Sequence, residues 1–117
     1  MASSDGRTEI LQNLTPIGVD PNNFDAILSG HDDLKDIVDP EGTSKPKPYI
    51  YQRTSKKLNV EPQECVVFED SSAGVNAASS AGMSVMAIPN SYTKNQDFSG
   101  AVNITTFSNI DINTLTQ

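Results

Sequence analysis

The chain has 117 residues, of which 36% are apolar, and its 15 acidic and 8 basic residues give a net charge of −7. This length suits a single domain with its own core. The acidic balance disfavours nucleic acid and anionic membrane surfaces as partners, and no apolar run approaches the roughly 18 residues of a membrane span. A single cysteine and an amino terminus without a basic or apolar stretch favour a cytoplasmic protein.

Short apolar runs alternate with helical patterns, which is typical of βα units around a parallel sheet and predicts an α/β fold. A first helix is expected around residues 7–14, with Ser4 or Asp5 as its N-cap. Phe24–Leu28 is expected to form a strand, and a polar loop should follow it over residues 29–44.

The second half of the chain carries stronger patterns. Pro48 suits the first turn of a second helix that extends to Leu58. Cys65–Phe68 is a continuous, β-branched apolar run, so we expect a strand that is buried on both faces. Further elements are expected at 72–81 (a helix ended by Gly82), 84–88 (a strand) and 102–105 (an edge strand).

Two consecutive carboxylates, Glu69 and Asp70, follow the apolar strand. They should lie at the carboxyl edge of the sheet, where α/β folds bind ligands. Oxygen ligands of this kind suit Mg²⁺, which takes one or two carboxylates and keeps water or phosphate for its remaining positions. The alternative is that both acids only cap the following helix.

Two further segments have the chemistry of anion binding. In Lys45-Pro46-Lys47-Pro48 the prolines fix the local direction, so we expect Lys45 to reach the carboxylates or a phosphate while Lys47 faces water. Ser3 and Ser4 precede the first helix, and hydroxyls with free N–H groups at such a position form an anion site. Each segment alone would equally suit a surface loop or an ordinary N-cap.

The order of these segments resembles the haloacid dehalogenase-like (HAD) superfamily, in its β-phosphoglucomutase and small sugar-phosphatase branch. The run from Val66 to Met83, Val-Val-Phe-Glu-Asp-Ser-x-x-Gly-Val-x-Ala-Ala-x-x-Ala-Gly-Met, carries the resemblance. Lys45-Pro46-x-Pro48-x-x-Tyr51 looks like the third motif of the family, Glu69-Asp70 like the fourth, and Ser3 like the hydroxyl of the second. The segments Ile88–Asn90 and Asp97–Ala101 are also similar to this branch.

The resemblance implies a three-layer, Rossmann-like parallel sheet and phosphoryl transfer through an aspartyl-phosphate with Mg²⁺. Asp70 would bind Mg²⁺ directly, and Glu69 would be a second or water-mediated ligand. Lys45 would be catalytic, bridging nucleophile and phosphate. Ser3, with Ser4 beside it, would bind a phosphate oxygen of a small phosphorylated metabolite.

The first motif of the family, Asp-x-Asp at the end of a strand, is absent from the sequence. The family's sheet order, 3-2-1-4-5, would place the absent strands between Phe24–Leu28 and Cys65–Phe68. Residues 1–117 are therefore expected to be the C-terminal portion of one core domain, without the cap and the nucleophile segment, and inactive alone. We expect the exposed sheet edge to bind a missing N-terminal half or to self-associate.

Two other functional classes compete with this interpretation. One is a non-catalytic remnant or binding module of the same fold. The other is a receiver-like domain, which uses similar residue types in the reverse order. The acidic stretch over residues 30–44 is expected to be a solvated loop, although a metal-like cluster is the alternative. His31 and Cys65 are expected to have plain polar and packing roles.

Overall fold

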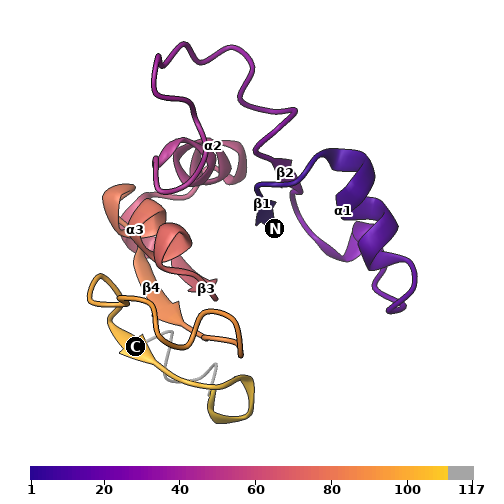
Figure 1. The fold of residues 1–117 in the computed structure, drawn as a ribbon. Coiled ribbons are helices and arrows are strands. Elements are labelled where there is room, and N and C mark those ends of the chain that lie inside the picture. Colours follow the sequence, from indigo (N-terminus) through magenta and orange to yellow (C-terminus); the bar gives the residue numbers. More distant parts are fainter. Residues whose placement is uncertain (111–117) are drawn as a thin grey trace.

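The computed structural model describes residues 1–110, in which short parallel strands alternate with helices (Figure 1). The three helices are α1 (Arg7–Leu14), α2 (Tyr49–Leu58) and α3 (Ser72–Ser80). The strands are β1 (Ala2–Ser3), β2 (Leu28–Ser29), β3 (Val66–Glu69), β4 (Ser84–Ala87) and β5 (Asn103–Ile104). The α/β fold with parallel strands is thus confirmed. Within the described residues, no helix is long and apolar enough to cross a membrane.

The strands form two separate parallel sheets, β1–β2 and β3–β4–β5. In the larger sheet β4 is central, and its Val85 and Ala87 are fully buried beneath α3. The covering face of α3 consists of Val75, Ala77 and Ala78, whose small side chains let the helix approach the sheet closely. The predicted strand at 84–88 is thus confirmed, one residue shorter.

The predicted strand at Phe24–Leu28 is largely wrong, because only Leu28 and Ser29 are in a strand. The partner strand explains the difference. β1 has only two residues, Ala2 and Ser3, so only two positions of β2 have a backbone to pair with. The chain before β2 forms a 3₁₀ turn over Pro21–Asn23 instead, with Asp20 accepting a hydrogen bond from the Asn22 N–H.

β3 forms where expected, but the prediction that it is buried on both faces is wrong. Val66 is 37% exposed and Phe68 is 41% exposed. The reason is that Val66 and Phe68 lie on the face of the sheet opposite to Glu69, and α3 packs on the face of Glu69. In addition, β3 is an edge strand, because it pairs with β4 on one side and no described strand pairs with its other side.

The first helix begins where expected but is not capped by Ser4 or Asp5. Its N-cap is Gly6, which has no side chain to offer. The carboxylate of Asp32, 25 positions further along the chain, accepts a hydrogen bond from the Arg7 N–H at 2.7 Å instead. The cap therefore comes from the acidic loop, which a search for a local capping residue does not consider.

The acidic loop lies on the surface, yet its acids are ion-paired rather than simply solvated. Each of the two arginines of the chain binds one of them: Arg7 binds Asp33 at 2.6 Å and Arg53 binds Asp36 at 2.8 Å. Further pairs join Lys35 to Asp32, and Lys47 to Asp39 and Glu41. The two arginine pairs fasten the loop to α1 and α2. No group of three metal-binding side chains occurs in residues 1–110.

Candidate active site

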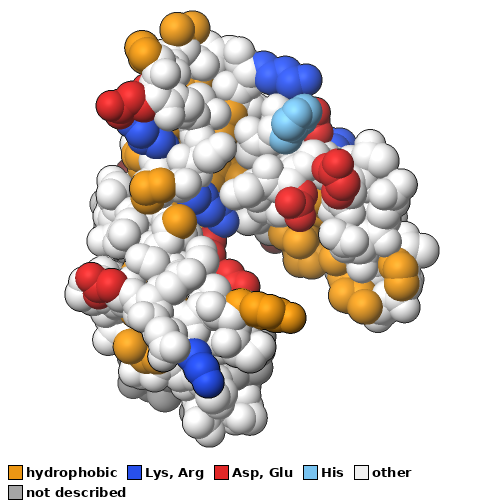
Figure 2. Space-filling view, in the orientation of Figure 1, with side chains coloured by type: hydrophobic (Ala, Val, Ile, Leu, Met, Phe, Trp, Pro, Cys, Tyr) orange, Lys and Arg blue, Asp and Glu red, His pale blue; other side chains and the backbone are white. Residues whose placement is uncertain are grey.

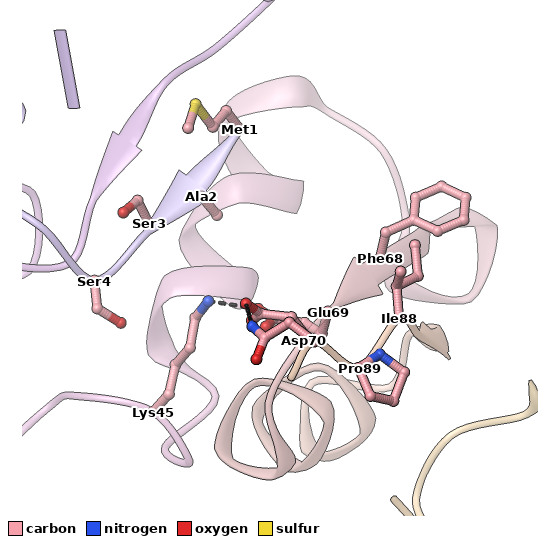
Figure 3. Close-up of a pocket in the computed structure, with 11 residues that line it drawn as sticks. Met1, Ala2, Ser3, Ser4, Lys45, Phe68, Glu69, Asp70, Ile88 and Pro89 are labelled. Carbon is pink, nitrogen blue, oxygen red and sulfur yellow. Dashed lines mark hydrogen bonds and ion pairs between the residues drawn. The ribbon is translucent and has the colours of Figure 1, made fainter. Parts of the chain in front are cut away.

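A cavity of about 540 Å³ lies where β1 and β3 end, and the sequence-predicted site residues surround it (Figure 3). It is lined by Met1, Ala2, Ser3, Ser4, Lys45, Phe68, Glu69, Asp70, Ile88, Pro89 and Asn90. The carboxyl ends of parallel strands are the usual place for ligands in α/β folds. All five residues that the sequence singled out therefore lie around one cavity, although they are up to 67 positions apart (3 to 70).

Lys45 reaches the carboxylates, as predicted, and Lys47 does not. The Nζ atom of Lys45 lies 2.5 Å from Oε1 of Glu69, and both side chains are nearly buried. Lys47 instead faces the acidic loop, where its Nζ lies 2.8 Å from Oε2 of Glu41. The two prolines direct the neighbouring lysines to different sides, and this confirms the geometry expected from the motif.

Tyr51 completes the surroundings of Glu69. Its hydroxyl donates a hydrogen bond to the same Oε1 atom that Lys45 contacts. The ammonium of Lys45 also lies 5.1 Å from the centre of the Tyr51 ring, a cation–π distance. Burial and the adjacent Glu69 charge raise the pKa of Tyr51, so this hydroxyl stays protonated and remains a donor.

Gly74 provides the space that the Glu69 carboxylate occupies. Gly74 lies in the first turn of α3, and a Cβ atom at this position would overlap the Glu69 carboxylate. Only glycine, which has no side chain, therefore fits at this position of the helix. Lys45, Tyr51 and Gly74 hold Glu69 between them, so that this acid is an internal counter-ion in the structure.

Asp70, unlike Glu69, lies exposed at the cavity, where the Asn90 side-chain amide donates a hydrogen bond to its Oδ2 at 3.1 Å. Neither acid caps α3, so the alternative that Glu69 and Asp70 only cap the following helix is wrong. Ser71 is the N-cap, and its hydroxyl accepts from the Gly74 N–H at 3.1 Å. The carboxylate of Asp70 is thus available to a cation in the cavity.

Ser3 and Ser4 line the cavity on the side opposite the carboxylates, and Figure 3 shows the Ser4 hydroxyl directed toward Lys45 and the Ser3 hydroxyl turned away from it. The Ser3 hydroxyl oxygen accepts a hydrogen bond from the Asp5 N–H at 3.2 Å, which leaves its own hydrogen free to donate. One wall of the cavity therefore carries the two serines, and the other wall offers an ammonium and a carboxylate. Such a pairing suits a phosphate bound together with a cation.

The donor set fits Mg²⁺ in part. Mg²⁺ needs only one or two protein carboxylates when water and phosphate fill its other positions, and Asp70 meets that need. Glu69 is in contact with Lys45 and Tyr51, and is not free to bind a cation in this arrangement. Asp70 is accordingly the residue that best fits the ion.

Sequence reasoning missed three contributors to this site. The sequence patterns place Tyr51 only in the motif of Lys45, Gly74 only within a helix, and Asn90 only in a segment similar to the family. Only for Tyr51 did a signal exist, since it lies in the motif of Lys45. The contacts of Gly74 and Asn90 depend on how α3 and the end of β4 meet β3, which no local pattern reports.

The comparisons with known proteins identify the family of the chain. The family model described as haloacid dehalogenase-like hydrolase matches residues 7–82. The CbbY protein of Rhodobacter capsulatus is 41% identical over 87 residues, which cover 68% of this chain and 38% of that protein. A phosphorylated carbohydrates phosphatase of Thermotoga maritima is 39% identical over 83 residues, which cover 71% of this chain and 34% of that protein.

A solved structure gives the same result for the fold. CbbY of Rhodobacter sphaeroides in complex with phosphate has a TM-score of 0.64 and 31% identity, and the match covers 76% of this chain and 36% of that chain. The chain thus spans less than two fifths of these relatives. Taken with the site geometry, these matches show that the chain belongs to the haloacid dehalogenase-like hydrolase family, in the branch of CbbY, β-phosphoglucomutase and the sugar phosphatases.

Proposed function

We propose that the chain forms the phosphate- and cation-binding part of the active site of a Mg²⁺-dependent phosphatase or phosphomutase. The observation that carries this proposal is the convergence of Ser3, Lys45 and Asp70 on one cavity. A hydroxyl donor, a fixed ammonium and a free carboxylate match the parts that phosphoryl transfer requires, because this chemistry depends on positioning and charge neutralisation.

Each of these residues has a separate task in the proposed mechanism. Ser3 and Ser4 donate hydrogen bonds to phosphate oxygens and orient the group. Lys45 neutralises negative charge on the phosphate, and Glu69 keeps its ammonium at the edge of the cavity. Asp70 holds Mg²⁺, which would supply further charge neutralisation of the phosphate.

The substrate class follows from the relatives and remains part of the proposal. CbbY of Rhodobacter sphaeroides has been solved with phosphate and with xylulose-(1,5)-bisphosphate. The Thermotoga maritima relative is named for phosphorylated carbohydrates. A small phosphorylated carbohydrate, processed through an aspartyl-phosphate, is therefore the substrate that we propose for the complete active site.

The nucleophile for this reaction has to come from outside the 117 residues, since the sequence has no Asp-x-Asp motif. We propose that residues 1–117 are the C-terminal portion of one core domain and that the chain alone binds phosphate without turnover. The competing function is a binding module of the same fold that never receives a nucleophile. Phosphate binding alone fits both functions, whereas turnover after addition of the complementary part of a relative fits only the first.

The test uses the chain as it exists, with inorganic phosphate and Mg²⁺ as probes. We expect phosphate to shift the backbone NMR signals of Ser3 and Ser4, and Mg²⁺ to shift that of Asp70. Asp70→Asn should abolish the Mg²⁺ shifts, while Asp97→Asn, an exposed acid outside the cavity, should leave them unchanged. Absence of these shifts would contradict the proposed site. Mg²⁺-dependent hydrolysis of p-nitrophenyl phosphate by the chain alone, lost in Asp70→Ala, would contradict the missing nucleophile.

A further inference from the structure

The loop over residues 90–96, which follows β4, begins at the active-site cavity. Asn90 lines this cavity together with Asp70. Figure 2 shows the molecule hollowed between the part that carries α1 and the part that carries β3, β4 and β5, with acidic side chains exposed at the edge of the hollow. Asp70 is the proposed ligand of the cation, and Asn90 is the residue of this loop that contacts it.

Two contacts place this loop beside Asp70. Just after β4, the Ile88 N–H donates to the carbonyl of Glu69 at 2.7 Å, so the chain leaves β4 next to the end of β3. Near the other end of the loop, the side-chain oxygen of Gln96 accepts a hydrogen bond from the Ser72 N–H at 2.8 Å, in the first turn of α3. The loop is thus attached to the chain on both sides of Asp70.

The side-chain amide of Asn90 is held in one orientation by its own loop. Its oxygen accepts hydrogen bonds from the N–H groups of Tyr92 at 2.8 Å and Thr93 at 3.1 Å, and from the Thr93 hydroxyl at 3.3 Å. The backbone N–H of Asn90 in turn donates to the Thr93 hydroxyl oxygen at 3.0 Å. Because these donors converge on the amide oxygen, the NH₂ group points the other way, where it donates to Oδ2 of Asp70 at 3.1 Å.

A neutral donor acts on a carboxylate differently from a cation. Lys45 neutralises the charge of Glu69 and occupies its oxygen. The Asn90 amide carries no charge, so Asp70 keeps its full negative charge while one of its oxygens is fixed. Within residues 1–110, no lysine or arginine forms an ion pair with Asp70. A ligand that is oriented before the ion binds loses less conformational freedom on binding.

We propose that Asn90 is a positioning residue, which fixes the carboxylate of Asp70 for the cation without cancelling its charge. This inference rests on the proposed function, because it takes Asp70 as the ligand of Mg²⁺. Removal of a hydrogen-bond partner of a metal ligand typically lowers metal affinity by about 10–100-fold. The contact between Asn90 and Asp70 is exposed to water, so we expect an effect at the lower end of this range.

The first measurement uses NMR on the chain without added metal. We expect the side-chain NH₂ protons of Asn90 to exchange with water more slowly than those of Asn95, an exposed amide in the same loop. Asp70→Ala should remove this difference, because it deletes the acceptor of the hydrogen bond. Equal exchange of the two amides in the natural chain would overturn the inference whether or not the chain binds Mg²⁺.

The second measurement is the affinity for Mg²⁺, followed by the shift of the Asp70 backbone signal. Asn90→Ala should weaken binding of Mg²⁺ by about tenfold, whereas Asn95→Ala should leave it unchanged. Thr93→Val loosens the same loop, because it removes two contacts of Asn90, but it keeps the amide and its backbone donors. It should therefore weaken binding much less than Asn90→Ala. An equal loss in both variants would show that the loop, and not the amide, determines the affinity.

Two further results would overturn the inference and leave the proposed function in place. Equal Mg²⁺ affinity of the natural chain and Asn90→Ala would show that Asp70 needs no positioning. Unchanged Mg²⁺ affinity with weaker binding of inorganic phosphate in Asn90→Ala would show that Asn90 contacts the phosphate itself. Mg²⁺ shifts that persist in Asp70→Asn would instead contradict the proposed function, and the inference with it, so the two failures are distinguishable.

Discussion

At the scale of single residues, Glu69 shows what allows a carboxylate to be buried. Only 8% of this side chain is exposed, and an unpaired charge at that depth would cost several kcal/mol. The Lys45 ammonium and the Tyr51 hydroxyl share its Oε1 atom, and together they offset the loss of water. Removing one partner should therefore lower the free energy of unfolding strongly, and removing both charges together should lower it much less.

Lys45→Met should lower the free energy of unfolding by about 3–5 kcal/mol, because it leaves the buried Glu69 carboxylate without a cation. Urea unfolding followed by circular dichroism measures the change. The matched control is Lys47→Met, whose partners Asp39 and Glu41 lie in the surface loop, and its effect should be much smaller. Adding Glu69→Gln to Lys45→Met should restore much of the loss. An equal loss with and without Glu69→Gln would contradict the pairing.

Gly74→Ala should destabilise the chain although alanine is the better helix former. In an ordinary helix position this change stabilises by about 0.5–1 kcal/mol. Here the added Cβ overlaps the Glu69 carboxylate, and overpacking of this kind costs about 1–3 kcal/mol. Ser80→Ala, at an exposed position of the same helix, is the control and should be close to neutral. A stabilised Gly74→Ala variant would show that Glu69 lies elsewhere.

At the scale of elements, α1 depends on a residue that is distant in the sequence. The N–H of Arg7 and the hydroxyl of Ser29 both donate to Oδ2 of Asp32, at 2.7 Å and 3.2 Å. The hydrogen bond from Arg7, followed by that from His31, lowers the pKa of Asp32 from 3.8 to about 2. The cap is therefore strongest when this carboxylate is ionised.

The stability of α1 should fall between about pH 4 and pH 2. Because the folded-state pKa of Asp32 lies below its unfolded value of 3.8, its contribution is present above pH 4 and disappears as pH falls through about 2. Asp32→Asn keeps an acceptor but does not titrate, so its midpoint of urea unfolding should change less over this window than that of the natural chain. Other acids titrate equally in both proteins and cancel in the difference. Parallel pH profiles would contradict this role of Asp32.

At the scale of the whole molecule, α2 connects the two sheets. It contacts β1 and β2 on one side and α3 on the other, whereas the sheets themselves do not pair (Figure 1). Its Ile50 is 2% exposed and belongs to the single core cluster that includes Leu28 and Val85. Because the two sheets do not pair with each other, this helix is the main link between the two halves.

Ile50→Ala should therefore separate the two halves as well as destabilise them. The lost methyl groups and the cavity should cost about 2–5 kcal/mol. Amide exchange should speed up at both Leu28 and Val85, which lie in different sheets. Leu58→Ala, in the same helix but 37% exposed, should change neither rate much. Faster exchange at Leu28 alone would show that β3–β5 is stable without α2.

The sequence by itself determined the α/β class, the family, and five of the residues that line the active-site cavity. It did so because these features depend on local patterns. The apolar run of Cys65–Phe68 ends at Glu69 and Asp70 whatever surrounds it. The prolines next to Lys45 and Lys47 fix the local backbone, and the two lysines point to different sides. Strand ends and proline geometry are properties of a few neighbouring residues.

Only the tertiary structure decided where long-range pairing succeeds. Phe24–Leu28 has the composition of a strand. However, β1 consists of two residues, so only two residues of β2 have a backbone to pair with. Val66 and Phe68 are apolar enough for a buried strand, yet they stay partly exposed because α3 covers the other face of the sheet and β3 has no described neighbour on one edge. The cap of α1 by Asp32 and the fit of Glu69 against Gly74 likewise join residues far apart in sequence or on different elements. A strand, a cap and a buried charge each need a partner, and the position of that partner is a property of the folded chain.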